Sequence, residues 1–360
     1  MRYYAQTMPG VEEITWLEIR SRLPEAKFSE TLFAKEQNGI VIFEYEGAIG
    51  NLLQLRTAED VFIEALSVEK LSRDWRDLRQ VADQIANSAA FGRAIGALTR
   101  YQAKRSRSPS YRVVARKYGR HQYRRKDLQE AVLKGMKWRY PLWRPLADDA
   151  QIEIWVNLLG SRLLCGLRLS DRTMRHRHRK AVELEASLRP SVAAAMIFLT
   201  ESEPADVFLD PMSGSGTMLM ERRMAGPYRQ MLAADIDASR AVATRTNLLA
   251  QRKEPPKALT VMQADARRLP FADGVIDKVA ANLPFGKQIG SPRAVATLYP
   301  AFFAQLERVL RPGGRAVILS SEYEEIKEAV RRQPGLVILT GYSVAVLGQW
   351  GRIYIMERKT

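Results

Sequence analysis

Polar side chains stand at the ends of short apolar segments in the second half of the chain. Asp210, Asp235, Asp265 and Asn282 each lie at or just after such a segment. In open parallel sheets, ligands bind beyond the carboxyl ends of the strands. If these segments are neighbouring strands, the four side chains converge on one ligand site.

The segment 210–217, of sequence DPMSGSGT, combines a carboxylate with glycines and hydroxyl groups. Its glycines let the backbone approach a ligand closely, and Asp210 can accept a hydrogen bond from a ligand ammonium. The spacing is not that of the phosphate-binding GxGxxG or GxxxxGK patterns, so a dinucleotide or a nucleoside triphosphate is disfavoured. A Gly-x-Gly alone is more often an ordinary turn. The residues predicted to bind a cofactor here are Asp210, Ser213, Gly214, Gly216 and Thr217.

Two further carboxylates indicate a pocket the size of adenosine. Asp235 can chelate ribose hydroxyls, as the corresponding acid does in Rossmann sites. Asp265, followed by Ala266, can accept a hydrogen bond from an adenine amine. Either acid taken alone could instead be a helix N-cap or a loop residue. Their positions after successive strands favour the binding interpretation.

The segment from Asn282 to Phe285, of sequence NLPF, indicates which kind of group reacts. Asn282 offers an amide oxygen, and Pro284 restrains the backbone so that a carbonyl can lie beside it; both can accept hydrogen bonds from a planar exocyclic amine. Phe285 can stack on the base. Such an amine is a weak nucleophile, so orienting it is a large part of the catalysis. The alternative is a proline-capped loop with a buried phenylalanine.

Apolar segments alternate with helical ones from residue 188 onward, which predicts an α/β fold with a doubly wound parallel sheet. The expected strands are 206–209, 231–234, 259–262, 275–281 and 315–319. The expected helices are 191–200, 216–224, 239–251 and 294–310. Segments 336–342 and 351–356 predict an antiparallel pair that closes the sheet, which departs from a purely parallel dinucleotide fold.

The composition limits the classes of protein and of partner. The 360 residues carry a net charge of +16, of which +12 falls on residues 1–180 (33 Lys and Arg, 21 Asp and Glu), which favours a polyanion as partner. One cysteine and three histidines leave little material for disulfides or metal sites, so we expect no metal. No segment has the pattern of a signal peptide or a membrane span, so we expect a cytoplasmic protein without membrane association.

Residues 84–126 contain no acidic residue and interleave basic side chains with Tyr101, Tyr111, Tyr118 and Tyr123. A solvated, partly disordered basic loop is one interpretation. The tyrosines favour RNA, because an aromatic ring stacks on exposed bases while arginine binds phosphate. The residues predicted to bind RNA, from this segment and from a second basic cluster at 172–180, are Arg105, Arg107, Arg116, Lys117, Arg120, Arg124, Arg125, Lys126, Arg175 and Arg177.

The first half of the chain predicts small α+β units. The expected strands are 2–7, 39–45, 61–66, 152–158 and 163–169. The expected helices are 11–23, 48–57, 75–87 and 127–140. His176 and His178 lie among arginines, where cationic neighbours make them poor metal ligands, so a phosphate-facing or solvated loop is expected there.

The chain resembles the amino-methyltransferases in the segments 210–217 and 282–285 and in the acids Asp235 and Asp265. More narrowly, it is similar to the THUMP-domain RNA guanine-N2 methyltransferases, and in layout to the TrmN-like tRNA methyltransferases. The segments that carry this narrower resemblance are 8–13 (MPGVEE), 56–61 (RTAEDV) and 175–179 (RHRHR). Three positions depart from the family pattern: Met212, Ser213 and Leu283 stand where Phe, Cys and Pro are common.

The resemblance implies a Rossmann-like class I methyltransferase domain at 188–360, preceded by a ferredoxin-like domain at 1–68, a THUMP domain at 69–172 and a basic linker at 173–187. It also implies S-adenosyl-L-methionine as cofactor, tRNA as partner, and methylation of a guanosine N2 amine, at position 6 of the acceptor stem. The alternatives are another tRNA or rRNA site, adenine-N6 methylation, or a non-catalytic RNA-binding factor. We expect a monomer without an obligate protein partner.

Overall fold

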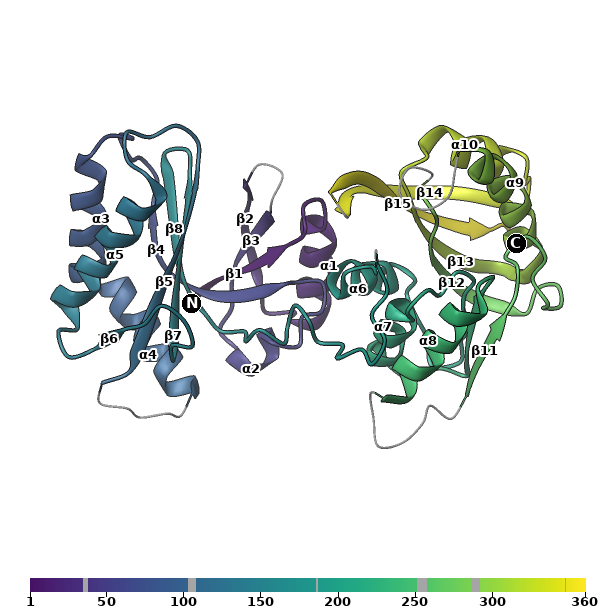
Figure 1. The fold of residues 1–360 in the computed structure, drawn as a ribbon, viewed down its shortest axis with the longest axis horizontal. Helices are drawn as coiled ribbons and strands as arrows, with labels where there is room; N and C mark the ends of the chain where they lie inside the picture. The colour runs from purple at the N-terminus through teal and green to yellow at the C-terminus, as the bar shows by residue number, and fades with distance from the viewer. Residues whose placement is uncertain (35–37, 103–107, 186, 251–257, 286–291, 347) are drawn as a thin grey trace. The chain divides into compact units, whose positions relative to one another are not determined.

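The computed structural model describes residues 1–360 apart from 35–37, 103–107, 186, 251–257, 286–291 and 347. The chain forms two compact units, residues 1–174 and residues 175–360 (Figure 1). Each unit has its own sheet and its own apolar core. The predicted boundary of the second part, at residue 188, lies within the second unit.

The first unit contains an eight-stranded sheet in the order β2-β3-β1-β4-β8-β7-β5-β6. Its strands are β1 Arg2–Thr7, β2 Lys27–Ala34, β3 Asn38–Glu44, β4 Asp60–Val68, β5 Ser110–Tyr118, β6 Arg144–Pro145, β7 Ile152–Leu159 and β8 Arg162–Arg168. Its helices are α1 Glu12–Arg22, α2 Ile49–Leu52, α3 Arg76–Asn87, α4 Ala89–Gln102 and α5 Arg125–Arg139. Antiparallel pairing of β4 with β8 makes the sheet continuous, and the division into domains at 1–68 and 69–172 stays a prediction.

The basic segment 84–126 is largely regular structure, so the interpretation as a disordered loop was wrong for its described part. Residues Ala89–Gln102 form helix α4 and Ser110–Tyr118 form strand β5, and neither element was predicted. In β5, Tyr111, Val113 and Ala115 are buried while the residues between them are half-buried. This alternation is typical of a strand, but the basic side chains on its other face obscured it.

The second unit contains a seven-stranded sheet in the order β11-β10-β9-β12-β13-β15-β14. Its strands are β9 Val207–Asp210, β10 Gln230–Asp235, β11 Leu259–Gln263, β12 Ile276–Asn282, β13 Leu310–Ser320, β14 Leu336–Val346 and β15 Gln349–Arg358. Its helices are α6 Pro190–Leu199, α7 Thr217–Ala225, α8 Ala238–Ala250, α9 Pro292–Val309 and α10 Tyr323–Arg331. The predicted order of strands and helices is confirmed, apart from helix α10, which was missed.

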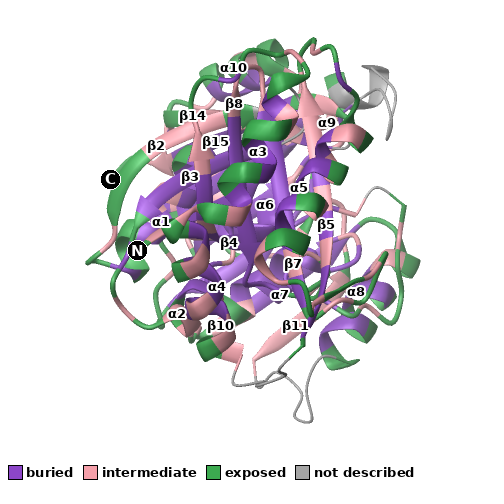
Figure 2. Ribbon diagram, turned by 90° about the vertical axis from the view of Figure 1, so that its left-hand side faces the viewer, coloured by how far each residue is buried: buried purple, intermediate pink, exposed green. Residues whose placement is uncertain are grey.

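Strand direction in this sheet follows the prediction. Strands β9 to β13 are parallel to their neighbours, whereas β15 runs antiparallel to both β13 and β14. The predicted closing pair is therefore confirmed. Buried residues colour much of the strands, and several helices, such as α3 and α8, carry exposed residues, whereas α6 has none (Figure 2). Because β9, β10 and β12 are parallel, their carboxyl ends lie at a common edge of the sheet, where side chains can contact a ligand.

Candidate active site

A cavity of about 510 Å³ lies at this edge of the second sheet. Nearly all the residues predicted for cofactor binding and catalysis line it. The predicted residues at the cavity wall are Asp210, Ser213, Gly214, Thr217, Asp235, Asp265, Ala266, Asn282, Pro284 and Phe285. Gly216 is not in the wall; it shapes the loop behind it. One pocket therefore brings together side chains that are as much as 75 residues apart (Asp210 to Phe285).

The loop between β9 and α7 depends on two glycines with positive φ. Gly214 (φ 54°) has open space where a side chain would begin, which leaves room for a ligand against the backbone. At Gly216 (φ 81°) a Cβ atom would lie 3.2 Å from Cγ2 of Thr244. The Thr244 hydroxyl donates to the carbonyl of Gly214 at 2.9 Å, so helix α8 holds this loop in place.

Asp210 and Asp235, at the ends of the adjacent strands β9 and β10, lie in different environments. Asp210 is buried, and this burial, followed by the nearby charge of Asp235, raises the pKa of Asp210 to about 8. The amide of Met212 opposes the shift by donating to Asp210 at 3.2 Å. Asp235 accepts from the amides of Gly214 at 2.9 Å and Asp237 at 3.1 Å, which orients its carboxylate between loop and cavity.

Asp265 forms a bidentate ion pair with Arg267, which also lines the cavity. The Nη2 atom of Arg267 lies 2.7 Å from Oδ2 of Asp265, and hydrogen bonding by this guanidinium lowers the pKa of the carboxyl group. The pair keeps Asp265 ionised at the wall. Arg267 uses part of the acceptor capacity of Asp265, so a ligand in the cavity can donate only to the remaining lone pairs of this carboxylate.

Strand β12 ends with an amide oxygen that has no partner among the described residues. The Oδ1 atom of Asn282 is buried and accepts no hydrogen bond from them. The backbone after it is held firmly: the amide of Leu283 donates to the carbonyl of Leu319 at 2.9 Å, and the hydroxyl of Tyr299 donates to the carbonyl of Pro284 at 3.0 Å. Phe285 is buried at the cavity wall. This arrangement presents one fixed, unused acceptor to a ligand.

The described residues of the segment 177–188 (all but 186), which we call the strap, pack on the loop before α7. The Nζ atom of Lys180 donates to the hydroxyls of Thr217 at 2.7 Å and Ser215 at 2.9 Å, and burial lowers the pKa of this lysine. The side-chain amide of Asn247 accepts a hydrogen bond from the backbone amide of Val182 and donates one to its carbonyl, both at 2.8 Å. Sequence reasoning placed Lys180 in a basic cluster and missed this role, because its partners lie 35 and 37 residues away.

His178, near the start of the strap, is buried, which corrects the expectation of a solvated or phosphate-facing loop at this residue. The Nε2 atom of His178 lies 2.5 Å from Oε1 of Glu221, and the Nε atom of Arg177 donates to the same oxygen at 2.8 Å. Arg177 also donates to the carbonyl of Pro190 at 3.0 Å. The guanidinium of Arg177 thus donates to Glu221 and Pro190 inside the protein, so Arg177 is not included in the proposed RNA surface.

The basic residues predicted for RNA binding in the first unit differ in exposure. Arg105 and Arg107 lie outside the described residues. Arg120, Arg124, Arg125 and Lys126 are exposed, while Arg116 and Lys117 are half-buried. The guanidinium of Arg116 lies 4.6 Å from the ring centre of Trp155. Tyr111 and Tyr123 are buried, the latter donating to Asp77 at 3.0 Å, so neither can stack on RNA as the sequence suggested.

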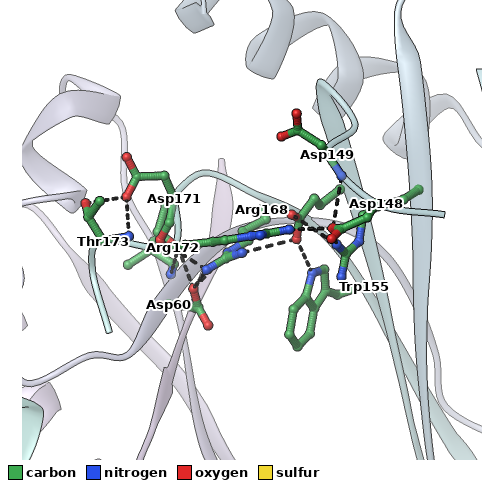
Figure 3. A network of polar contacts seen from close by, with 12 residues as sticks. Asp60, Asp148, Asp149, Trp155, Arg168, Asp171, Arg172 and Thr173 are labelled. Atoms are coloured by element: carbon green, nitrogen blue, oxygen red, sulfur yellow. Dashed lines mark hydrogen bonds and ion pairs between the residues drawn. The ribbon is translucent and has the colours of Figure 1, made fainter. Parts of the chain in front are cut away.

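Further arginines of the first unit pair with carboxylates in a polar network (Figure 3). Arg168 forms ion pairs with Asp60 at 2.6 Å and Glu153 at 3.2 Å. Arg112 and Arg172 both pair with Asp148. The pairs of Arg168 join β4, β7 and β8, so part of the positive charge in the first half of the chain is neutralised locally rather than offered to a polyanion.

Comparisons with known proteins agree with this geometry. Residues 177–345 match the RMKL-like methyltransferase domain family. The chain is 29% identical over 250 residues to a tRNA (guanine(6)-N2)-methyltransferase of Thermus thermophilus, covering 69% of this chain and 72% of that protein. It is 30% identical over 207 residues to tRNA (guanine(6)-N(2))-methyltransferase THUMP3 of Bos taurus, covering 55% of this chain but 40% of that longer protein.

Among solved structures, TrmN from Thermus thermophilus superposes with a TM-score of 0.75 at 25% identity, covering 99% of each chain. No helix in the described part of the chain is both long and apolar enough to cross a bilayer. The described residues also contain no cluster of three or more His, Cys, Asp or Glu side chains suited to a metal ion. The strand order, the family match and the superposition agree: the protein is a methyltransferase with a class I fold, and its residues 177–345 are similar to the RMKL-like methyltransferase domain family.

Proposed function

We propose that this protein transfers a methyl group from S-adenosyl-L-methionine to the exocyclic N2 amine of a guanosine in tRNA. The observation that carries the proposal is the buried Oδ1 atom of Asn282, unpartnered among the described residues, at the wall of an adenosine-sized cavity. A buried acceptor without a partner costs about 1–3 kcal/mol, so it is tolerated where a ligand supplies the donor. An exocyclic amine is such a donor.

The residues at the wall fit S-adenosyl-L-methionine. Asp210 would accept from its ammonium, Asp235 from its ribose hydroxyls and Asp265 from its adenine amine. The open space at Gly214 would let the amino-acid part lie against the backbone. When bound, this cofactor supplies a methyl group made electrophilic by a sulfonium.

The protein's own contribution is to position and hydrogen-bond the amine. The amine lone pair is delocalised into the ring, so Asn282 promotes reaction by orienting the amine and by accepting a hydrogen bond from it. The Tyr299 contact to Pro284 keeps the strand end rigid. The side chain of Phe285 is buried and forms part of the cavity wall, where it would close the pocket around the base. The proton lost after transfer can pass to solvent without a dedicated base.

tRNA is the proposed substrate for two reasons. The relatives in Thermus thermophilus and cattle are named as tRNA guanine-N2 methyltransferases. The exposed residues Arg120, Arg124, Arg125 and Lys126 offer positive charge to phosphates, and Arg116, Lys117 and Arg175 supplement them at half-buried positions. We place the target at position 6 of the acceptor stem and the reaction in the cytoplasm, with the enzyme acting as a monomer.

The test is incorporation of labelled methyl from S-adenosyl-L-methionine into unmodified tRNA, followed by digestion to nucleosides and mass-spectrometric mapping. We expect N2-methylguanosine at position 6. N6-methyladenosine instead would favour the adenine-N6 alternative, because an Asn-x-Pro-aromatic segment accommodates any planar amine. Binding of tRNA without any methyl incorporation would favour a non-catalytic RNA-binding factor.

A further inference from the structure

The β14–β15 hairpin reaches past the sheet edge at the proposed active site. Ser320, the last residue of β13, pairs with Arg352 of β15. Gln349 begins β15 and therefore lies beyond the end of β13, on the side where β12 ends with Asn282. Gln349 lines the same cavity as Asn282. A strand distant in sequence thus adds a polar side chain to the site.

Strand alternation explains why Gln349 faces the cavity. A Cβ atom on Gly351 would lie 3.4 Å from Cδ1 of Leu319 and 3.5 Å from Cζ of Phe285, so this face of β15 is directed at the end of β12. Residues two apart in a strand share a face, which places Gln349 beside Gly351. Trp350, which alternates to the other face, is 56% exposed.

Gln349 carries an unused donor. Its Nε2 atom is buried and has no hydrogen-bond partner among the described residues, as is true of Oδ1 of Asn282. The cavity wall therefore presents one unsatisfied amide donor and one unsatisfied amide acceptor, on separate strands. A planar base that offers an amine next to a ring acceptor would satisfy both groups at once.

We propose that Gln349 is a base-positioning residue that donates to the ring nitrogen beside the methylated amine. This inference rests on the proposed function, in which the amine is N2 of guanine. The carbon bearing N2 is flanked by N1, which carries a hydrogen, and by N3, which has a free lone pair. Only N3 can accept from Nε2 of Gln349. This second hydrogen bond would prevent the base from rotating about the one that it makes with Asn282.

The experiment combines a side-chain change with an atomic change in the RNA. Wild type, Gln349→Ala and Gln349→Glu are assayed on tRNA carrying either guanosine or 3-deazaguanosine, which has C–H in place of N3, at the mapped target. We expect each Gln349 variant to lose roughly 10-fold in kcat/KM on guanosine, because one hydrogen bond to the substrate is removed. On 3-deazaguanosine, wild type and Gln349→Ala should react at similar rates.

Two controls separate this role from a structural one. Ser343→Ala alters an exposed side chain of β14 and should leave both rates unchanged. Affinity for S-adenosylhomocysteine, measured by calorimetry, should be the same in wild type and Gln349→Ala. The proposal is overturned if Gln349→Ala stays as sensitive to 3-deazaguanosine as wild type, or if it loses cofactor affinity. Failure of wild type to form N2-methylguanosine would overturn the proposed function instead.

Discussion

Burial determines the protonation of Asp210, whose pKa of about 8 lies well above the ordinary value of 3.8 for an aspartate. An ammonium at the cavity would favour the charged carboxylate, so cofactor binding should release this proton. The same residue therefore links ligand binding to folding stability. Asp235 and Asp265 accept hydrogen bonds from backbone amides or from Arg267, so they meet a ligand already oriented.

Asp210→Asn should stabilise the folded protein more at pH 8 than at pH 5. The folded pKa is above the unfolded one, so the wild type retains its proton in the folded state and loses stability as the pH rises from about 4 to about 8. Asparagine removes this loss. We expect a Tm gain of roughly 3 °C or more at pH 8, measured by calorimetry, with weakened cofactor binding. An equal gain at both pH values would contradict this account of Asp210.

Asn282→Ala should lower kcat by roughly 100-fold or more, because the group that orients the amine is removed. Affinities for S-adenosylhomocysteine and for tRNA should stay within about twofold of wild type. Single-turnover methylation and filter binding measure the two quantities. A variant that loses affinity for tRNA but retains its rate would show that Asn282 serves binding and not reaction.

At the scale of elements, the strap and helix α8 hold the loop between β9 and α7 from two sides. Lys180 bonds the hydroxyls of Ser215 and Thr217, and Thr244 bonds the carbonyl of Gly214. A cation beside the start of a helix is unfavourable for the helix dipole, and burial adds to this cost. Lys180 contacts Ser215 and Thr217 of the cavity wall, a location that suits a negatively charged ligand group such as a carboxylate.

Lys180→Met should raise the KM for S-adenosyl-L-methionine by roughly 10-fold while kcat changes little, since the loop loses the cation and its two hydrogen bonds. Arg179→Ala, at the exposed neighbouring position, is the matched control and should behave as wild type. Steady-state kinetics at saturating tRNA measure both. A fall in kcat without a change in KM would argue against this role of Lys180.

At the scale of the whole molecule, the charge of +16 is distributed between internal pairs and exposed side chains. Arg112 and Arg168 are paired with carboxylates and largely shielded from solvent, and Arg172 is paired with Asp148 although it is exposed. Arg124 and Arg125 are exposed, and the side chain of Arg124 lies 3.7 Å from Asp127. Affinity for RNA depends on the cations that can replace counterions, not on the total charge. The exposed basic residues should therefore dominate the salt dependence.

Arg124→Ala with Arg125→Ala should weaken tRNA binding and reduce the slope of log Kd against log salt by about two, one for each phosphate that the protein no longer neutralises. Arg331→Ala with Arg332→Ala removes the same charge from exposed positions at the end of α10 and serves as the control. Binding measured from low to moderate salt distinguishes the two double variants. Equal slopes for both would show that only overall charge matters.

The sequence by itself determined the α/β sheet of the second unit and the residues at its carboxyl edge. Strand spacing and the glycine-bearing turn are local patterns, and parallel strands necessarily bring their carboxyl ends together. Asp210, Asp235, Asp265 and Asn282 could thus be named from the sequence. The strand β5 escaped prediction because charged residues masked its alternation.

Only the tertiary structure decided which polar groups are used internally and which remain available. Arg177 and Tyr123 looked suited to RNA, yet Glu221 and Asp77 engage them inside the protein. Gln349 lies 67 positions after Asn282 in sequence but in the same cavity wall. Such pairings depend on packing between distant segments, which no local pattern of residue types encodes.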